Sequence, residues 1–256
     1  MKRSTTRDDL IKKIIYVILS AVFWTALWDF VSYKVSLELL LPSPYQTFKR
    51  LLELSSQKQF WLSALTSLKN TLSGFAFGVV CGTVLAVITS VLKGADILFS
   101  PINTVIRATP VASFIILALV WIDSANVPSF IAFLMVTPII WNALKTALQK
   151  VNPRLKEMAG AYKLSVAKQV FHLYIPSVFA QYVSAMITSM GLSWKASIAA
   201  EVLCRPSGTV GTSIYNSKLY LESTDLFAYT ATVIIFSIVL EMLFRYIMNK
   251  LVKGEK

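Results

Sequence analysis

Three ionisable residues, Arg107, Lys195 and Glu241, lie inside long apolar runs of the chain. A charged side chain at the centre of a membrane costs about 2.5–3.5 kcal/mol on insertion scales, so each should face a cavity, a partner or an interface. Arg107 and Lys195, with Pro110 close by, are therefore candidates to line a path for an anionic solute. Each cation also has a structural interpretation, because Arg107 could bind carbonyls freed by Pro110 and Lys195 could extend towards the membrane surface. Glu241 precedes Arg245 by four residues, which predicts a structural ion pair.

Residue types that carry enzyme chemistry are scarce. The chain has one histidine, His172, and two cysteines, Cys81 and Cys204, so a metal centre held by these residue types is not expected. The sequence contains no Gly-x-x-x-x-Gly-Lys-Ser/Thr, Gly-x-Ser-x-Gly or His-Glu-x-x-His motif. These absences argue against ATP binding by a P-loop and against serine or zinc hydrolase chemistry. We therefore expect a non-catalytic chain with no cofactor of its own.

The composition is typical of a membrane protein. Of 256 residues, 55% are hydrophobic and 15% are charged, whereas an ordinary soluble domain is roughly 45–50% apolar. Windows of about 19 residues predict an all-α protein with six transmembrane helices in a single permease domain, residues 1–256. A cleavable signal peptide is the alternative for the first run, but its length favours a retained span. The predicted spans are 14–31, 72–92, 97–122, 127–144, 178–200 and 226–244.

The placement of basic residues predicts the orientation. The chain has 25 Lys and Arg against 13 Asp and Glu, a formal net charge of +12. If both termini are cytoplasmic, sixteen of the 25 basic residues fall in inner segments and seven in outer segments, as the positive-inside rule requires. The charge is thus explained by the lipid bilayer, and no nucleic-acid-binding motif accompanies it.

The second predicted span carries Gly74, Gly78 and Gly82 at intervals of four, which places all three on one helical face. Small residues allow two membrane helices to approach closely, so this face should contact another helix of the bundle or dimer. The alternative is that glycine is simply tolerated in membrane helices.

Two outer segments have their own patterns. Residues 45–60 follow Pro42-Ser43-Pro44 and predict an amphipathic helix along the outer surface. Residues 201–225 contain turn-forming residues and predict a loop that returns towards the bundle. Glu201, at the start of this loop, is either a gate or receptor contact or a plain interfacial carboxylate.

The inner loop, residues 145–176, is helical in pattern but too short to form a domain. Asn152 and Pro153 predict the start of a helix, and Glu157 should lie near its positive end. Small residues follow, so this surface should fit a groove of a partner protein. The alternative is an amphipathic helix that lies on anionic lipid.

The order of residues in this loop resembles a known motif. The stretch reads Glu157-Met158-Ala159-Gly160-Ala161-Tyr162-Lys163-Leu164-Ser165, followed by Tyr174-Ile175-Pro176. It resembles the EAA…G…LP coupling motif of permease subunits of binding-protein-dependent ABC importers, most closely the nitrate/sulfonate/taurine type. Shorter stretches that resemble the same family are Leu41-Pro42-Ser43-Pro44, Arg107-Ala108-Thr109-Pro110, Val151-Asn152-Pro153-Arg154-Leu155, Gly191-Leu192-Ser193-Trp194 and Ala199-Ala200-Glu201.

The resemblance implies a type I importer permease fold in the bacterial cell membrane. It also implies a second copy of this permease, two ABC ATPase subunits that bind ATP and Mg, and an extracytoplasmic solute-binding protein. The residues that it assigns to contact with the ATPase are Glu157, Met158, Ala159, Gly160, Ala161, Lys163, Leu164, Ser165 and Pro176.

Two positions depart from the family pattern. Met158 stands where alanine is usual, and Lys163 stands where glycine is usual. Glycine permits a turn with positive φ, which lysine resists. Either the turn here uses ordinary dihedral angles, or Lys163 meets an acidic patch on the ATPase.

The resemblance implies a small polar or anionic solute as the cargo, with a pyrimidine precursor of thiamine or another small organic solute as the alternative. Members of this family are associated with nitrate, sulfonates, taurine, bicarbonate and pyrimidine precursors of thiamine. An ion-coupled secondary transporter is a more remote alternative, since the sequence has no carboxylate near the middle of a span and no visible inverted repeat.

Overall fold

The computed structural model describes residues 7–35, 37 and 39–254, and within these ranges all regular structure is helical. This confirms the all-α prediction, while the basic residues 2 and 3 lie outside the described residues. The elements are α1 Arg7–Val35, α2 Pro44–Ser55, α3 Lys58–Val91, α4 Lys93–Ala108, α5 Val111–Ala118, α6 Val127–Gln149, α7 Pro153–Ala161, α8 Val166–Gln169, the π-helix η1 Val170–Tyr174, α9 Ile175–Cys204, α10 Val210–Leu219 and α11 Ser223–Gly254.

Five helical stretches in the described residues are long and apolar enough to cross a membrane: Ile15–Val35, Lys58–Val91, Val127–Gln149, Val166–Cys204 and Ser223–Lys250. A sixth candidate is the pair α4 and α5, which are bent by 104° at residues 109 and 110. The predicted third span, 97–122, is therefore not a straight helix with a kink. Pro110 cannot donate a backbone hydrogen bond, and residue 109 before it is held in an extended conformation with ψ 130°, so the helix stops and restarts.

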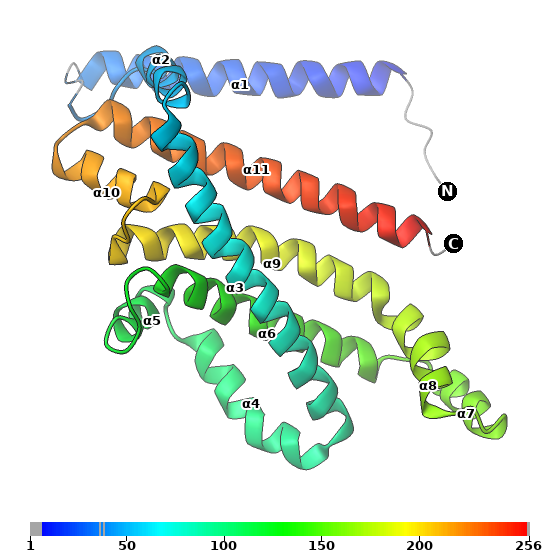
Figure 1. Ribbon diagram of the computed structural model, residues 1–256. Coiled ribbons are helices and arrows are strands. Elements are labelled where there is room, and N and C mark those ends of the chain that lie inside the picture. The colour runs from blue at the N-terminus through cyan, green and yellow to red at the C-terminus, as the bar shows by residue number, and fades with distance from the viewer. Residues whose placement is uncertain (1–6, 36, 38, 255–256) are drawn as a thin grey trace.

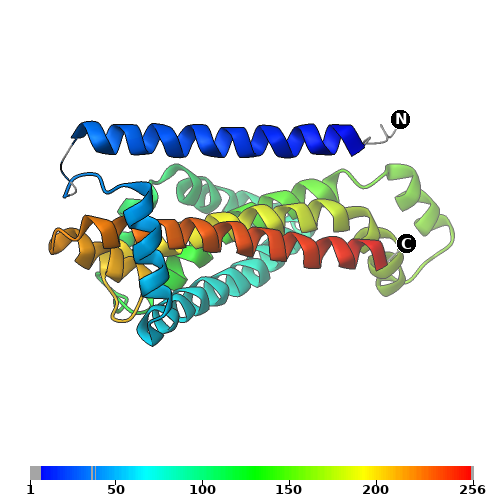
Figure 2. The ribbon, with the colours of Figure 1, turned by 90° about the horizontal axis from the view of Figure 1, so that it is seen from above.

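The bundle is centred on α3, α6 and α9, which run beside one another through the middle of the molecule (Figure 1). Apolar clusters join them, one of which contains Phe75 of α3, Ile140 of α6 and Met190 of α9. In contrast, α1 lies along the outside of the bundle (Figure 2), and its candidate span buries none of its residues.

The second span begins earlier than its hydropathy predicts. The predicted span was 72–92, but α3 already starts at Lys58, and the predicted amphipathic helix 45–60 ends at Ser55 as α2. Ser63, Ser67 and Thr71 lower the hydropathy of this stretch although each is at most 4% exposed. They recur every four residues and so form the inner face of the helix.

The remaining spans run past their predicted ends. The helix predicted at 127–144 continues to Gln149, those predicted at 178–200 and 226–244 extend at both ends, and the predicted inner loop 145–176 thus begins inside α6.

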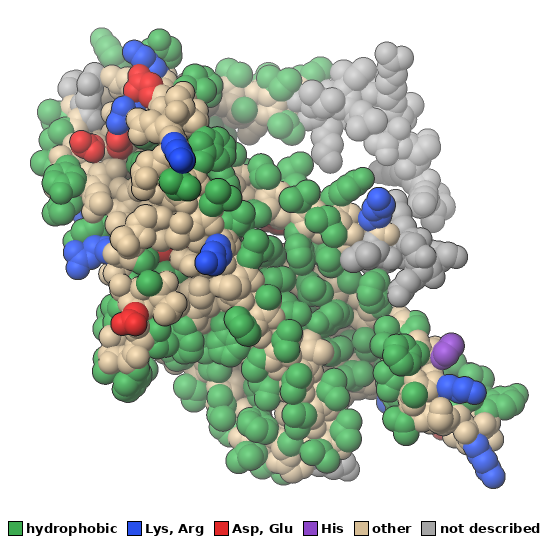
Figure 3. Space-filling view, viewed as in Figure 1, with side chains coloured by type: hydrophobic (Ala, Val, Ile, Leu, Met, Phe, Trp, Pro, Cys, Tyr) green, Lys and Arg blue, Asp and Glu red, His purple; other side chains and the backbone are tan. Residues whose placement is uncertain are grey.

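The two ends of the bundle differ in composition from its middle. One end holds α2, α5 and α10, and the other holds α7 and α8 together with the start of α1 and the end of α11 (Figures 1 and 2). Charged side chains gather at these two ends, whereas the middle of the visible face is hydrophobic (Figure 3). This distribution is that of a bundle whose middle lies in lipid.

Candidate functional site

The helix predicted in the inner loop is α7, and its start is confirmed. The Asn152 side chain accepts a hydrogen bond from the backbone N–H of Arg154 at 3.0 Å, and Pro153 occupies the first turn. Glu157 lies in the second turn, beyond the reach of the positive helix end, so the expected dipole contribution is not supported. The cap and the proline fix where this short helix begins.

The helix ends in a turn that uses a left-handed residue. Lys163 has φ 48°, its N–H donates to Gly160 O at 3.0 Å, and the N–H of Leu164 donates to Ala159 O at 3.0 Å. These two bonds form a Schellman motif, in which glycine is the usual left-handed residue. Of the two alternatives left open by the sequence, ordinary dihedral angles are wrong, because Lys163 itself adopts the left-handed conformation.

Most of the α7 surface is free in the single chain. Glu157, Met158, Gly160 and Ala161 are exposed, and the space beside Gly160 is open. Ala159 is the exception, since it is 1% exposed and packs in a cluster with residues of α6 and α9. The expectation that Ala159 contributes to a docking surface is therefore wrong. It anchors α7 to the bundle instead.

The connection from α7 to α9 contains a π-helical turn. Ser165 precedes α8, and the N–H of Ile175 donates to Val170 O, five residues earlier. Pro176 follows in the first turn of α9, where a missing N–H is tolerated. A π-turn at this place absorbs one extra residue without breaking the helix.

Arg107 lies in the last turn of α4, beside the 104° bend, and it is exposed. In the part of the chain that the structure describes, its side chain makes no hydrogen bond or ion pair. The nearby carbonyl of Val105 is bonded by the N–H and the hydroxyl of Thr109 instead. The interpretation of Arg107 as a cap for carbonyls freed by Pro110 is therefore not supported.

Lys195 is exposed on α9 between two buried residues, Trp194 and Ala196. It belongs to an exposed stripe of α9 that also contains Thr188, Leu192 and Ala199. Ile106 and Ala196, the chain neighbours of Arg107 and Lys195, belong to one apolar cluster. The helix segments that carry the two cations thus contribute to the same apolar cluster.

Polar contacts hold α4 against α6. Asn103 and Asn142 exchange side-chain hydrogen bonds of 2.8 and 3.2 Å, and Lys145 pairs with Asp96 at the start of α4. These two pairs set the position of α4 and hence of Arg107 at its end. The sequence pattern did not predict either pair.

The three glycines of α3 face α6. A Cβ atom at Gly74 would lie 2.1 Å from Ser129 O, one at Gly78 would lie 2.7 Å from Val136 Cβ, and one at Gly82 would lie 2.7 Å from Thr137 O. Distances this short leave no room for a side chain. The contact lies within a single bundle.

Glu201 is the functional-looking residue whose surroundings the sequence did not predict. It is 0% exposed, accepts hydrogen bonds from Ser67 Oγ at 2.7 Å and from the Gly211 N–H at 3.1 Å, and so joins α9 to α3 and to the start of α10. Gly211 is required here, because a Cβ would lie 2.3 Å from Glu201 Cβ. The burial of Glu201 excludes direct contact of this carboxylate with the receptor.

Two further predictions concern single side chains. Arg245 donates to Glu241 at 2.8 Å, so the predicted i,i+4 pair is confirmed. His172 is exposed in η1, with Nδ1 3.1 Å from Lys168 O, as expected for a surface residue.

The fold itself matches solved transporter subunits. A chain from the crystal structure of an amino acid ABC transporter with histidines aligns with a TM-score of 0.60 and 16% identity, covering 74% of this chain and 91% of that chain. The arrangement of helices is thus that of a type I ABC importer permease.

The sequence comparisons give the family. The model for binding-protein-dependent transport system inner membrane components matches residues 74–254, and the chain belongs to this family. The nitrate import permease protein NrtB of Synechocystis sp. (PCC 6803) is 28% identical over 197 residues, which are 71% of this chain and 70% of the relative. The taurine transport system permease protein TauC of Escherichia coli K12 is 20% identical over 240 residues, 90% of this chain and 86% of the relative. The chain is a permease component of an ABC importer, and ATP hydrolysis belongs to a separate subunit.

Proposed function

We propose that this permease forms the path for a small anionic or polar solute, of the nitrate or taurine class that its relatives transport. The observation that carries the proposal is the pair of exposed cations, Arg107 and Lys195, at membrane depth beside one apolar cluster. Exposure to lipid would be unfavourable for both, so a polar environment at the interface with a second copy is the reasonable surrounding. A path must also release its cargo, which favours a few cations over a tight pocket.

The exposed stripe on α9 supports the same assignment. Lys195 lies on it together with Thr188 and Ala199, and this face is not covered by the chain's own helices. The bend beside Arg107 leaves irregular backbone at membrane depth, which is tolerated where it lines a cavity or meets protein. Both features suit a surface that meets a second permease across a polar passage.

The α7 surface is the proposed contact with the ATPase. Its helix is capped and its turn is formed before any partner is present, while Glu157, Met158 and Ala161 remain exposed. A preformed surface binds with less loss of conformational entropy than one that must fold on contact. In this assembly α7, α8 and both termini lie on the cytoplasmic side, two copies of the permease bind two ATPases, and the solute-binding protein docks at the opposite end.

The test is solute uptake into vesicles that contain the permease, its ATPase and its binding protein. We expect Arg107→Gln and Lys195→Gln to lower uptake roughly tenfold or more, the loss of about 1.4 kcal/mol of favourable interaction with the passing anion. The affinity of the binding protein for its solute should not change. Lys49→Gln, a change of an exposed lysine on α2, is the matched control and should transport normally.

Normal uptake by both path variants would refute the path assignment. Loss of uptake with a matching loss of folded protein would show that the cations are structural. Uptake that depends on a proton or sodium gradient and not on ATP would overturn the coupling assignment.

A further inference from the structure

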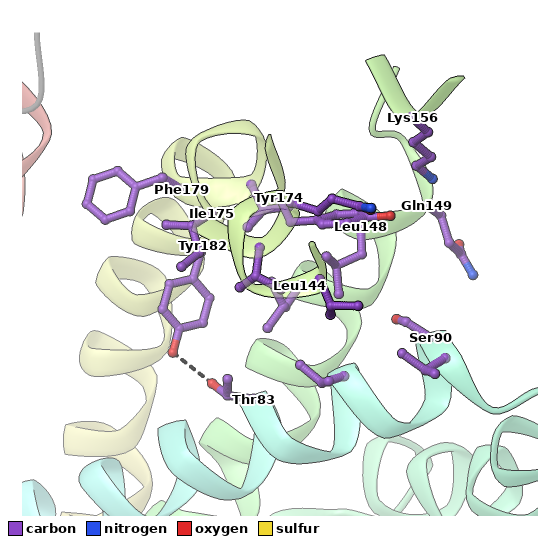
Figure 4. A pocket seen from close by; sticks show the side chains of 16 residues that line it. Thr83, Ser90, Leu144, Leu148, Gln149, Lys156, Tyr174, Ile175, Phe179 and Tyr182 are labelled. Carbon is purple, nitrogen blue, oxygen red and sulfur yellow. Dashed lines mark hydrogen bonds between the residues drawn. The ribbon is translucent and has the colours of Figure 1, made fainter. Parts of the chain in front are cut away.

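A cavity of about 920 Å³ lies where the inner-loop elements meet the spans. Its wall is built from α3, α6, α7, α8, η1 and α9, and Figure 4 shows the side chains that line it. The volume is near the upper end of the range for small-molecule sites. At the end away from Lys156 the hydroxyl oxygens of Thr83 and Tyr182 lie 2.7 Å apart (Figure 4). Because Thr83 donates its proton to Val79 O, Tyr182 donates to Thr83, and neither hydroxyl has a proton left to donate to an anionic ligand.

The wall is mostly aliphatic and aromatic, and its central labelled residues include Leu144, Leu148 and Ile175 (Figure 4). Lys156 is the one charged residue that the structure places on it. In the apolar interior a nitrate- or taurine-like solute would lose its hydration and gain no charged partner, because Lys156 lies at the rim. The cavity is therefore distinct from the proposed solute path, and its ligand must be largely apolar.

The rim supplies the polar part of the site. Lys156 Nζ lies 6.0 Å from the centre of the Tyr174 ring, and Gln149 stands at the same side of the opening (Figure 4). Ser90 Oγ, on the wall, is buried and has no hydrogen-bond partner in the part of the chain that the structure describes. A buried hydroxyl without a partner is unfavourable unless a ligand or water accepts its hydrogen bond.

The surroundings indicate a negative charge on the ligand. The chain between residues 150 and 170 carries five Lys or Arg residues and one acidic residue, Glu157. Basic side chains at the end of a membrane bundle attract anionic headgroups. An apolar interior, one cation at the mouth and this basic margin together match a lipid with a negatively charged head.

We infer that this cavity binds one anionic phospholipid, with an acyl chain between α3, α6 and α9 and its phosphate at Lys156. Because the cavity wall includes α7, α8 and η1, the lipid would hold the inner-loop elements against the spans. The inference goes beyond the proposed transport function and does not depend on it.

The test uses the full-length permease alone, reconstituted in phosphatidylcholine bilayers with a minority of phosphatidylglycerol and analysed by native mass spectrometry. Lys156→Gln should reduce retained phosphatidylglycerol roughly fivefold, since one cation near the headgroup is lost. Lys168→Gln removes the same charge from an exposed residue of the same region that does not line the cavity, and it should retain lipid normally.

A second pair of variants tests the apolar part. Val170 lines the cavity, whereas its exposed neighbour Phe171 does not. Val170→Trp should exclude the acyl chain and remove bound lipid of either headgroup, while Phe171→Trp should not. Equal phosphatidylglycerol retention by Lys156→Gln and Lys168→Gln would overturn the inference, and it would do so even if Val170→Trp failed to fold. A change in dimer content without loss of lipid would instead assign the cavity to a second copy.

Discussion

The two ends of the bundle are held together in different ways. At the end with α2 and α10, polar groups bond across distant parts of the chain: Ser67 to Glu201, and Arg50 to Asp225 at 2.6 and 2.9 Å. We call this the closed end. Hydrogen bonds to Asp225 and Glu53 raise the pKa of the Arg50 guanidinium above its ordinary value, so the guanidinium stays charged at every physiological pH.

At the end with α7 and α8, here called the open end, the hydrogen bonds of the inner-loop segment itself are local. The bonds of Asn152 to Arg154, Leu164 to Ala159 and Gln169 to Leu164 each span at most five residues. Local bonds fix the shape of a segment but contribute little to its attachment. The difference teaches that the closed end is complete in the single chain, whereas the open end is shaped in advance and left for a partner.

The largest expected effect is at the closed end. Glu201→Ala removes the acceptor of two buried donors, Ser67 and Gly211. Each buried donor without an acceptor costs about 1–3 kcal/mol, so the free energy of unfolding should fall by roughly 3 kcal/mol or more. Denaturant titration in detergent measures it. Glu222→Ala, at an exposed position in the turn after α10, should change the free energy of unfolding little. Equal losses in the two variants would contradict the buried network.

The next largest expected effect is a loss of stability at the contact between α3 and α6, in the middle of the bundle. Gly78→Leu places a side chain where a Cβ alone would lie 2.7 Å from Val136 Cβ. Overpacking of this kind typically costs about 1–3 kcal/mol. Thermal unfolding in detergent should report the loss, and Val80→Leu, on the exposed side of the same helix, is the control. If both variants unfolded alike, the glycine face would not be a tight contact.

At the open end we expect a loss of association without a loss of stability. Ala161→Trp adds bulk to an exposed position of α7, so folding should be unaffected while co-purification of the ATPase falls about tenfold, equivalent to about 1.4 kcal/mol. Ala167→Trp, at an exposed position of α8, is the matched control. Undiminished co-purification of the Ala161 variant would place the ATPase contact elsewhere.

The smallest expected effect is a gain in the stability of the turn that ends α7. Lys163→Gly relieves a left-handed lysine, which is unfavourable by about 1–2 kcal/mol, and part of this gain is offset by the greater flexibility of glycine in the unfolded chain. Protection of the α7 amides from hydrogen exchange should increase slightly. Lys163→Ala removes the same charge but keeps the Cβ atom, and it should give no gain. Increased amide protection in both variants would show that removal of the lysine charge, and not relief of the left-handed turn, is the cause.

The sequence predicted what depends on local pattern. Hydropathy located the spans, and Asn152 and Pro153 located the start of α7, because a cap and a helix-starting proline act on adjacent residues. It did not predict the early start of α3, since the buried Ser63 and Ser67 count as polar in any hydropathy window.

Long-range contacts lay beyond the sequence pattern. Glu201 and Ser67 are 134 residues apart, and nothing near either one indicates the other. The same holds for Asn103 and Asn142. The left-handed Lys163 was missed for another reason, because the two hydrogen bonds of the Schellman motif outweigh the residue's own conformational preference.

The π-helical turn Val170–Tyr174 has a geometric consequence for the whole inner loop. An α-helix turns by about 100° and rises about 1.5 Å with each residue. The one additional residue that the π-turn accommodates therefore sets the angular phase between α9 and the segment that carries α7. Loss of a single residue there would keep every helix intact and yet point the α7 surface in a different direction. The direction in which this permease presents its inner loop is thus encoded by chain length as much as by side chains.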